Sequence, residues 1–236
     1  MAAAVARGWA GVVERMLFTD SGSGRARALA AEVGGEALGS NRELAEVADL
    51  VVLAVKPAML EEVAEELRGA RAVVSLLGAT SLEKVAAAFP NASVLRVMPN
   101  VGVEVRRGVL CVAGGGDAEV REILGALGHV VELPDEDFDA ATAVMGCAPA
   151  YLALAIEAIA DAGAKDGLDP GLARELVVET AAGTAELLRL RHPAEVRDAV
   201  ASPGGSTEAG LEALDREGAR EAFEAAVRAS LERMRR

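Results

Sequence analysis

Up to about residue 134, short apolar segments alternate with longer stretches in which apolar residues recur every three or four positions. Several of the short segments are apolar throughout, as in Leu50–Val55 (LVVLAV). Strands covered on both faces show such runs, and the amphipathic stretches between them predict helices. We therefore predict an α/β fold, a Rossmann-like doubly wound sheet. The predicted strands are Met16–Thr19, Leu50–Val55, Ala72–Leu77, Val94–Met98, Val109–Ala113 and Val130–Leu133, and the predicted helices are Met1–Glu14, Arg25–Val33, Glu43–Ala48, Met59–Leu67, Leu82–Phe89 and Ala118–Leu127.

From residue 135 onward the pattern is almost continuously helical and rich in alanine, leucine and glutamate. We predict a dinucleotide-binding domain over residues 1–134 and an all-α domain over residues 135–236. The stretch Tyr151–Ile156 (YLALAI) is apolar on most helical faces, yet a bundle this small has little interior in which to bury it. We therefore expect a dimer that shares helices. The predicted breaks are Gly167–Pro170, His192-Pro193, Ser202–Ser206 and a point near Gly218.

The start of the sequence departs from the order expected of a dinucleotide-binding sheet. Such a sheet opens with a strand, a glycine-rich turn and a helix whose N-terminus meets the pyrophosphate. Here the predicted helix Met1–Glu14 comes first, and Gly22-Ser23-Gly24 follows the next strand without a third glycine. We expect the first strand and its turn to lie upstream of Met1, and a sheet without that strand to contain a gap. The alternative is a genuine truncation.

Composition narrows the range of partners. The 236 residues carry a formal net charge of -13 and only 3% aromatic residues, which disfavours binding to nucleic acid and to anionic lipid. No apolar run is expected to reach the roughly 20 residues of a membrane helix. Two cysteines without CxxC spacing suit a reducing cytoplasm, and neither of the two histidines has a partner that suggests a catalytic triad or a metal site. We predict a cytoplasmic protein without a bound metal.

Candidate ligand-binding residues lie where predicted strands end, because ligands of doubly wound folds bind outside the carboxyl ends of the strands. Two of these ends carry prolines, in Ala54–Pro57 and in Val97–Asn100. A third end carries Asp20 and Arg25, of which the acid favours a free ribose 2′-hydroxyl and the arginine a 2′-phosphate. NADH and NADPH therefore both stay possible. Asn100 is either a ligand contact or a turn residue.

The strongest local signal is the loop Ser202-Pro203-Gly204-Gly205-Ser206-Thr207. Its two glycines let the backbone turn sharply and approach a ligand closely. Ser206 or Thr207 is then expected to cap a helix, where free N–H groups and the positive end of the helix dipole suit a carboxylate. A capped helix after an ordinary turn is the competing interpretation.

These pieces together resemble one family, the pyrroline-5-carboxylate reductases, over the whole chain. Val200–Asp215 (VASPGGSTEAGLEALD) is similar to the family's signature. Leu53–Pro57 (LAVKP), Arg96–Asn100 (RVMPN) and Pro149–Tyr151 follow in the family's order, and Met1–Trp9 resembles the helix after the family's glycine turn.

The resemblance implies hydride transfer from C4 of NADPH or NADH to the C=N carbon of 1-pyrroline-5-carboxylate, which gives L-proline. It implies that the backbone of Gly205–Thr207 holds the carboxylate and that the Thr207 hydroxyl faces the ring nitrogen. It also implies that family members pair through the helical domain, so that each site takes its cofactor side and its substrate loop from different subunits. The candidate substrate-binding residues are Gly204, Gly205, Ser206 and Thr207, with Thr207 catalytic, and the candidate cofactor-binding residues are Asp20, Ser21, Arg25, Asn41, Ala54, Val55, Lys56, Pro57, Met98, Pro99 and Asn100.

Three segments depart from the family's pattern: Met145–Ala148 where Ser-Gly-Ser-Gly is usual, Val101-Gly102 where Thr-Pro is usual, and Ser75–Thr80. They leave two alternatives open. One is a non-catalytic paralogue that retains the dimer, and the other is a related imine or β-hydroxyacid reductase with another substrate.

Overall fold

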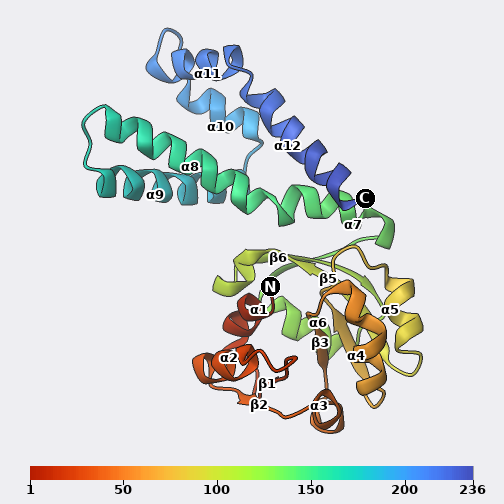
Figure 1. Ribbon diagram of the computed structural model, residues 1–236. Helices are drawn as coiled ribbons and strands as arrows, with labels where there is room; N and C mark the ends of the chain where they lie inside the picture. Colours follow the sequence, from red (N-terminus) through yellow and green to blue (C-terminus); the bar gives the residue numbers. More distant parts are fainter. Residues whose placement is uncertain (236) are drawn as a thin grey trace. The chain divides into compact units, whose positions relative to one another are not determined.

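The computed structural model describes residues 1–235, which form two compact units (Figure 1). The first unit comprises residues 1–147 together with the end of the chain from Leu231, and the second is Ala148–Ser230. The first unit contains all the strands of the described chain, and the second is helical. The predicted fold class, a Rossmann-like sheet followed by an all-α region, is confirmed. The predicted division after residue 134 lies close to the end of the last strand, whereas the compact units divide after Cys147.

The first unit is built on a sheet of five strands in the order β3-β4-β5-β6-β7. All six predicted strands are present, each with bounds that differ from the prediction. The chain also contains a strand that was not predicted, β2, which is only two residues long and exposed. The strands are β1 (Leu17–Phe18), β2 (Glu36–Ala37), β3 (Val51–Leu53), β4 (Ala72–Ser75), β5 (Ser93–Pro99), β6 (Gly108–Gly114) and β7 (Gly128–Glu132).

The sheet is mixed, because β6 runs antiparallel to β5 while the other neighbouring pairs are parallel. The reason is the length of the connection. Only residues 100–107 separate β5 from β6, and they include the 3-10 helix η2 (Val101–Val105). A parallel crossover needs about a dozen residues or more, so the chain turns back beside β5 instead.

The strands β1 and β2 pair with each other in a separate parallel sheet of two strands. In the described part of the chain, no strand joins this pair to β3. The predicted gap in the sheet is therefore confirmed.

Helices cover both faces of the five-stranded sheet (Figure 1). Side chains alternate between the faces, so that Val73 packs with α4 and α5 while its neighbour Val74 packs with α1 and α6. On the second of these faces Trp9 of α1 is buried, and its indole N–H donates to the carbonyl of Ile123 at 2.8 Å. The helices of this unit are α1 (Ala2–Trp9), α2 (Arg25–Val33), α3 (Asn41–Val47), α4 (Leu60–Glu66), α5 (Leu82–Ala88), α6 (Ala118–Gly125) and α7 (Phe138–Ala141), with the short 3-10 helices η1 (Pro57–Met59) and η3 (Asp135–Asp137) and the π-helix η4 (Thr142–Gly146).

A buried arginine fixes the segment after β7 to the sheet. Arg96 of β5 is 5% exposed, and its Nη1 lies 2.8 Å from Oδ1 of Asp135. The other carboxylate oxygen of Asp135 accepts the Leu82 N–H at 3.1 Å, at the start of α5. The Phe138 ring, fully buried, lies 4.4 Å from the guanidinium carbon, in cation–π geometry. One charge pair thus connects β5, α5 and α7.

The second unit consists of helices whose predicted breaks are all confirmed. Its own interior is small: within the unit only Ala160 and Ala173 are buried hydrophobic residues. Tyr151 of α8 joins α12 through its hydroxyl, which lies 2.5 Å from Oγ of Ser230. The helices are α8 (Ala148–Lys165), α9 (Pro170–Leu188), α10 (Pro193–Val200), α11 (Ser206–Arg216) and α12 (Ala219–Met234).

The expectation that no apolar stretch reaches the length of a membrane helix was wrong for one segment. The continuous helical stretch Asp135–Lys165 contains 18 residues of mean hydropathy 1.7, of which 6% are buried. By length and composition alone this stretch passes as a membrane span. The same property is expected of a helix whose apolar surface is covered by another protein chain.

The packing of α1 against η2 leads to a prediction about stability. A Cβ atom added at Gly8 would lie 2.2 Å from the carbonyl oxygen of Val103 and 2.6 Å from Cδ2 of Leu127. Gly8→Ala is therefore expected to force α1 away from η2 and to lower the free energy of unfolding by about 2 kcal/mol. Denaturant titration of the purified protein measures this change.

The matched control is Gly125→Ala, because Gly125 is also helical and a Cβ there meets no atom within 4 Å. It should leave stability unchanged or raise it by about 0.5 kcal/mol through its helix propensity. Equal stability of the two variants would contradict the close contact at Gly8.

Candidate functional site

Two of the predicted cofactor-binding segments lie at the same edge of the five-stranded sheet. Ala54–Pro57 follows β3 and Met98–Asn100 ends β5, and both strands run parallel to β4, which lies between them. Their carboxyl ends therefore meet at one edge, where ligands of this fold bind. Residues 54–57 are all exposed, and Val55 is 37% exposed although it is apolar. This edge offers a ligand an exposed surface that is partly apolar.

Asn100 is held by the protein itself. Its Oδ1 accepts the N–H groups of Gly102 at 3.2 Å and Val109 at 3.1 Å, and its Nδ2 donates to the carbonyl oxygen of Met145 at 3.2 Å. The side chain caps η2 and connects three segments. Of the two predicted roles, the turn residue is the one that these contacts support.

The loop after β4 also lies at this edge of the sheet, beside the loop after β3, and we had not predicted it to contact a ligand. Gly78-Ala79-Thr80 follows β4, between the two segments above. Ala79 has a φ of 51°, a left-handed conformation that costs a non-glycine residue about 1 kcal/mol or more. Thr80 is buried and its hydroxyl donates to the carbonyl of Gly78 at 3.1 Å. The sequence did indicate a loop at a strand end here, because Gly78 directly follows the predicted strand Ala72–Leu77.

The loop after β1 contains the two residues that favour different cofactors. Both oxygens of the Asp20 carboxylate accept backbone N–H groups, from Gly22 at 2.7 Å and from Ala26 at 2.6 Å. These hydrogen bonds, that from Ala26 foremost, lower the pKa of Asp20 below its ordinary value. Arg25 is exposed, and its only side-chain contact within the described residues is from Nε to the Ser23 hydroxyl at 3.2 Å. The acid shapes the loop, while the arginine is available to an anion.

Asn41 starts α3 and lies in a chain of side-chain hydrogen bonds. Its Oδ1 accepts the Thr19 hydroxyl at 2.6 Å, and its Nδ2 donates to the Glu66 carboxylate at 2.6 Å. These hydrogen bonds link Thr19, the residue after β1, to Glu66 of α4, a helix that packs on the five-stranded sheet. No contact places Asn41 beside residues 54–57 or 98–100 in the described structure.

The predicted substrate loop lies in the second unit, between α10 and α11. Gly204 has a φ of +74°, and a Cβ at Gly205 would lie 2.9 Å from the carbonyl oxygen of Ser202, so both positions favour glycine. The predicted cap was wrong: the N-cap of α11 is Gly205, and Ser206 is already helical. The helix has no side-chain cap; the Glu208 carboxylate instead accepts the N–H of Gly204, the residue before the N-cap, at 2.6 Å.

This arrangement leaves backbone donors at the start of an eleven-residue helix. The N–H groups of Ser206 and Thr207 have no acceptor within residues 1–235. Both residues are exposed. Free donors at the positive end of a helix dipole bind carboxylates and phosphates well.

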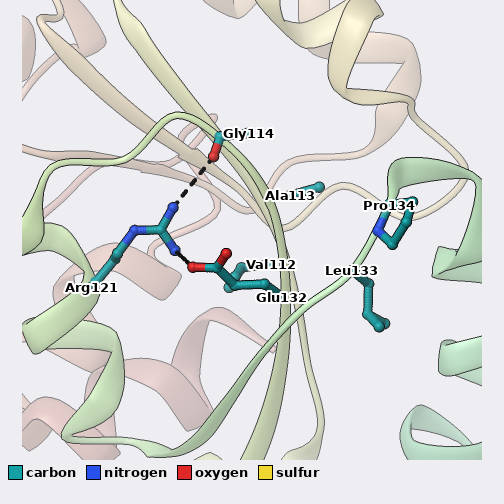
Figure 2. A pocket seen from close by; sticks show the side chains of 7 residues that line it. All are labelled: Val112, Ala113, Gly114, Arg121, Glu132, Leu133 and Pro134. Atoms are coloured by element: carbon teal, nitrogen blue, oxygen red, sulfur yellow. Dashed lines mark hydrogen bonds and ion pairs between the residues drawn. The ribbon is translucent and has the colours of Figure 1, made fainter.

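A shallow hollow on the first unit is a weaker candidate. Figure 2 shows Arg121 turned towards the Glu132 carboxylate and the Gly114 carbonyl, away from Leu133 and Pro134. The guanidinium forms an ion pair with Glu132 and reaches Gly114 at 3.5 Å. Its charge is thus already neutralised, and the rest of the lining is largely apolar.

The cysteines and histidines add no reactive centre. Cys111 is buried, and burial raises the pKa of its thiol, which disfavours the reactive thiolate. His192 uses Nδ1 to accept the Ala194 N–H at 3.3 Å, at the start of α10. Within the described residues, no three histidine, cysteine or acidic side chains are grouped so as to hold a metal ion.

Known proteins are similar to this chain over both of its units. The family description "Pyrroline-5-carboxylate reductase dimerisation" matches residues 135–236, and "NADP oxidoreductase coenzyme F420-dependent" matches residues 1–78. The chain is 40% identical over 204 residues to the pyrroline-5-carboxylate reductase of Synechocystis, an alignment that covers 82% of this chain and 76% of the relative.

Solved structures agree with this relationship. The chain is similar to the 1-pyrroline-5-carboxylate reductase of Streptococcus pyogenes, with 29% identity, a TM-score of 0.89 and coverage of 99% of this chain and 94% of the other. It is also similar to a Plasmodium falciparum pyrroline carboxylate reductase with NADP bound, with 27% identity, a TM-score of 0.86 and coverage of 98% and 92%. The likeness extends over both the strand-end edge and the glycine-rich loop. The chain therefore belongs to the pyrroline-5-carboxylate reductase family.

Proposed function

We propose that this protein reduces 1-pyrroline-5-carboxylate to L-proline with NADPH, as a homodimer in the cytoplasm. The observation that carries the proposal is the loop Ser202–Thr207, whose free N–H groups at the start of α11 suit the carboxylate of the substrate. Family membership and the relatives' names supply the reaction. The strand-end edge formed by the exposed Ala54–Pro57, the half-buried Met98 and the buried Pro99 is the proposed nicotinamide side.

The reaction requires little acid–base chemistry from the protein. The C=N carbon of a protonated imine is already electrophilic, and the nicotinamide supplies the hydride. What the protein contributes is orientation of the two reacting carbons and exclusion of water. In our proposal the amides of Ser206 and Thr207 hold the carboxylate, and the Thr207 hydroxyl fixes the ring nitrogen.

NADPH is proposed over NADH because of the loop after β1. The Asp20 carboxylate is occupied by two backbone N–H groups of its own loop, whereas Arg25 is exposed at the start of α2. A 2′-phosphate would find a guanidinium and a helix N-terminus there. The match of residues 1–78 to an NADP oxidoreductase description supports the same choice.

A homodimer is proposed because the second unit leaves its apolar side chains in solvent. Leu152 is 62% exposed and Leu154 is 65% exposed, and they point about 160° apart around α8, to nearly opposite sides. A single flat contact cannot cover both, so a second chain must pack around the helix. The family's dimerisation description spans this region. The free thiols Cys111 and Cys147 suit the reducing cytoplasm.

The direct test follows NADPH absorbance with the purified protein and 1-pyrroline-5-carboxylate, together with chromatographic detection of proline. Proline formed in proportion to NADPH consumed supports the proposal. Turnover of another cyclic imine or a β-hydroxyacid, with 1-pyrroline-5-carboxylate untouched, would favour a substrate-shifted relative. Binding of NADPH without turnover of any of these would favour the non-catalytic alternative.

Removal of the Thr207 hydroxyl is expected to slow the reaction. Thr207→Ala should lower kcat by roughly ten- to a hundredfold, because about 1.4 kcal/mol of transition-state stabilisation is lost per tenfold. Thr207→Ser keeps the hydroxyl and should retain most of the activity. Steady-state kinetics of the three proteins would disprove the role of the hydroxyl if Thr207→Ala matched the wild type.

Arg25 is expected to govern the choice of cofactor. Arg25→Ala should raise the KM for NADPH about tenfold and leave that for NADH nearly unchanged, because only NADPH carries the 2′-phosphate. Arg27→Ala is the matched control, since Arg27 is equally exposed on the same helix and has no side-chain hydrogen bond or ion pair in the described structure. A similar effect of both substitutions would indicate general charge attraction only.

The apolar surface of α8 is expected to form the dimer interface. Leu154→Arg should convert the dimer to monomer in size-exclusion chromatography with light scattering, because a buried unpaired charge costs several kcal/mol. Val105→Arg makes the same change at a residue of the first unit that is 70% exposed, and should stay dimeric. A Leu154→Arg dimer as stable as the wild type would remove α8 from the interface.

A further inference from the structure

The chain makes a π-helical turn just before α8. In η4 (Thr142–Gly146) the hydrogen bonds span five residues, as in Cys147 N–H to the Thr142 carbonyl at 3.1 Å. The Thr142 hydroxyl donates to the carbonyl of Phe138 at 2.6 Å. Such turns are rare, and they are frequent at functional sites. Just before this segment, Asp135 forms the ion pair with Arg96 and the Phe138 ring packs on the same guanidinium, which fixes one end of the segment.

A proline follows the other end of this segment, in the first turn of α8. Pro149 has no N–H, so it cannot donate to the Met145 carbonyl four residues earlier, as an ordinary helical residue would. The side chain of Asn100 donates to this same carbonyl, at 3.2 Å. A residue from the end of β5 thus replaces a hydrogen bond that the helix lacks.

The orientation of the Asn100 amide follows from its neighbours. Two N–H groups, of Gly102 and Val109, point at Oδ1, so Nδ2 must be the group that faces Met145. A Cβ at Gly102 would lie 3.2 Å from Asn100 Oδ1 and 2.9 Å from the Arg107 carbonyl oxygen. Glycine at 102 therefore lets the backbone come close enough to hold the amide.

The turn that Asn100 holds contributes to the edge of the proposed nicotinamide site. Met145 and Met98, the residue before Pro99 in β5, both pack against the buried cluster of Cys111, Ala113 and Phe138. If the turn moved, the packing of Met145 on this cluster would change, and with it the support of Met98, which we place beside the nicotinamide. A displacement of about 1 Å at such a wall can lower a hydride-transfer rate by one or two orders of magnitude.

We propose that Asn100 is a positioning residue: its side-chain amide supplies the donor that Pro149 lacks and thereby fixes the turn Thr142–Gly146, with Met145, against the end of β5. The proposal rests on the proposed reductase activity for its catalytic consequence. Asn100 acts on the protein backbone and does not need to touch the cofactor.

Asn100→Asp separates the two functions of the amide. A carboxylate still accepts from Gly102 and Val109, but it has no hydrogen to donate to Met145. We expect kcat to fall about tenfold or more with little change in the KM for NADPH, because orientation is lost and binding is not. We also expect faster deuterium uptake in the peptide that spans residues 142–147, measured by mass spectrometry.

Pro149→Ala restores a backbone N–H at the position that lacks one. In this background Asn100→Asp should lower kcat and speed deuterium uptake much less than it does in the wild-type background. Asn91→Asp is the matched control, because Asn91 is exposed and its side chain has no hydrogen bond in the described residues, and it should leave both readouts at wild-type values. Effects of equal size in the two backgrounds would overturn the proposal, as would wild-type kcat and uptake in Asn100→Asp.

Two further outcomes stay interpretable. If Asn100→Asp alone does not fold, the proposal requires that it folds in the Pro149→Ala background, and failure there too would count against it. If the wild type does not reduce 1-pyrroline-5-carboxylate, the proposed function fails, and the deuterium uptake of the four proteins still decides whether Asn100 holds the turn.

Discussion

The ion pair between Arg96 and Asp135 is the interaction on which the arrangement of the first unit depends. Arg96 is almost completely buried in β5, and a charge in that place is tolerated only with a partner and aligned donors. Asp135 provides the partner, the Phe138 ring covers the guanidinium, and the second carboxylate oxygen caps the start of α5. Loss of the Asp135 carboxylate would leave the buried Arg96 charge unpaired, at a cost of about 3–5 kcal/mol. The segment that leads into the helical unit is therefore attached to the strand that ends at the proposed cofactor edge.

The same strand carries a second attachment a few residues later. Asn100 joins the turn after β5, the start of β6 and the π-helical turn before α8. Two contacts from one strand, one ionic and one through an amide, hold residues 135–146 along the sheet. These contacts fix the position of the segment, and its Met145 packs against the same buried cluster as Met98.

The two units differ in how many of their apolar side chains are buried within the chain. The first buries apolar side chains on both faces of its sheet, in clusters that include residues such as Val73 and Val74 with almost no exposure. The second has long helices but almost no interior, and its leucines remain exposed. Because apolar surface of this extent is unfavourable in water, the helical unit is suited to pack against another chain. The apolarity of α8 that resembles a membrane span has this simpler explanation in a family with a dimerisation domain.

The sequence by itself determined the order of strands and helices, the helical second half, the glycine-rich loop and the family. These features are local: apolar runs specify buried strands, and a Pro-Gly-Gly segment specifies a turn whatever surrounds it. Only the tertiary structure decided that β6 runs antiparallel, that Gly205 is the N-cap of α11, and that Asp20 is occupied by its own loop. It also decided the role of Asn100, which no local pattern distinguishes from a ligand contact. The reason is that each of these depends on which donors and acceptors from distant segments meet, as Met145 and Asn100 do across 45 positions of the chain.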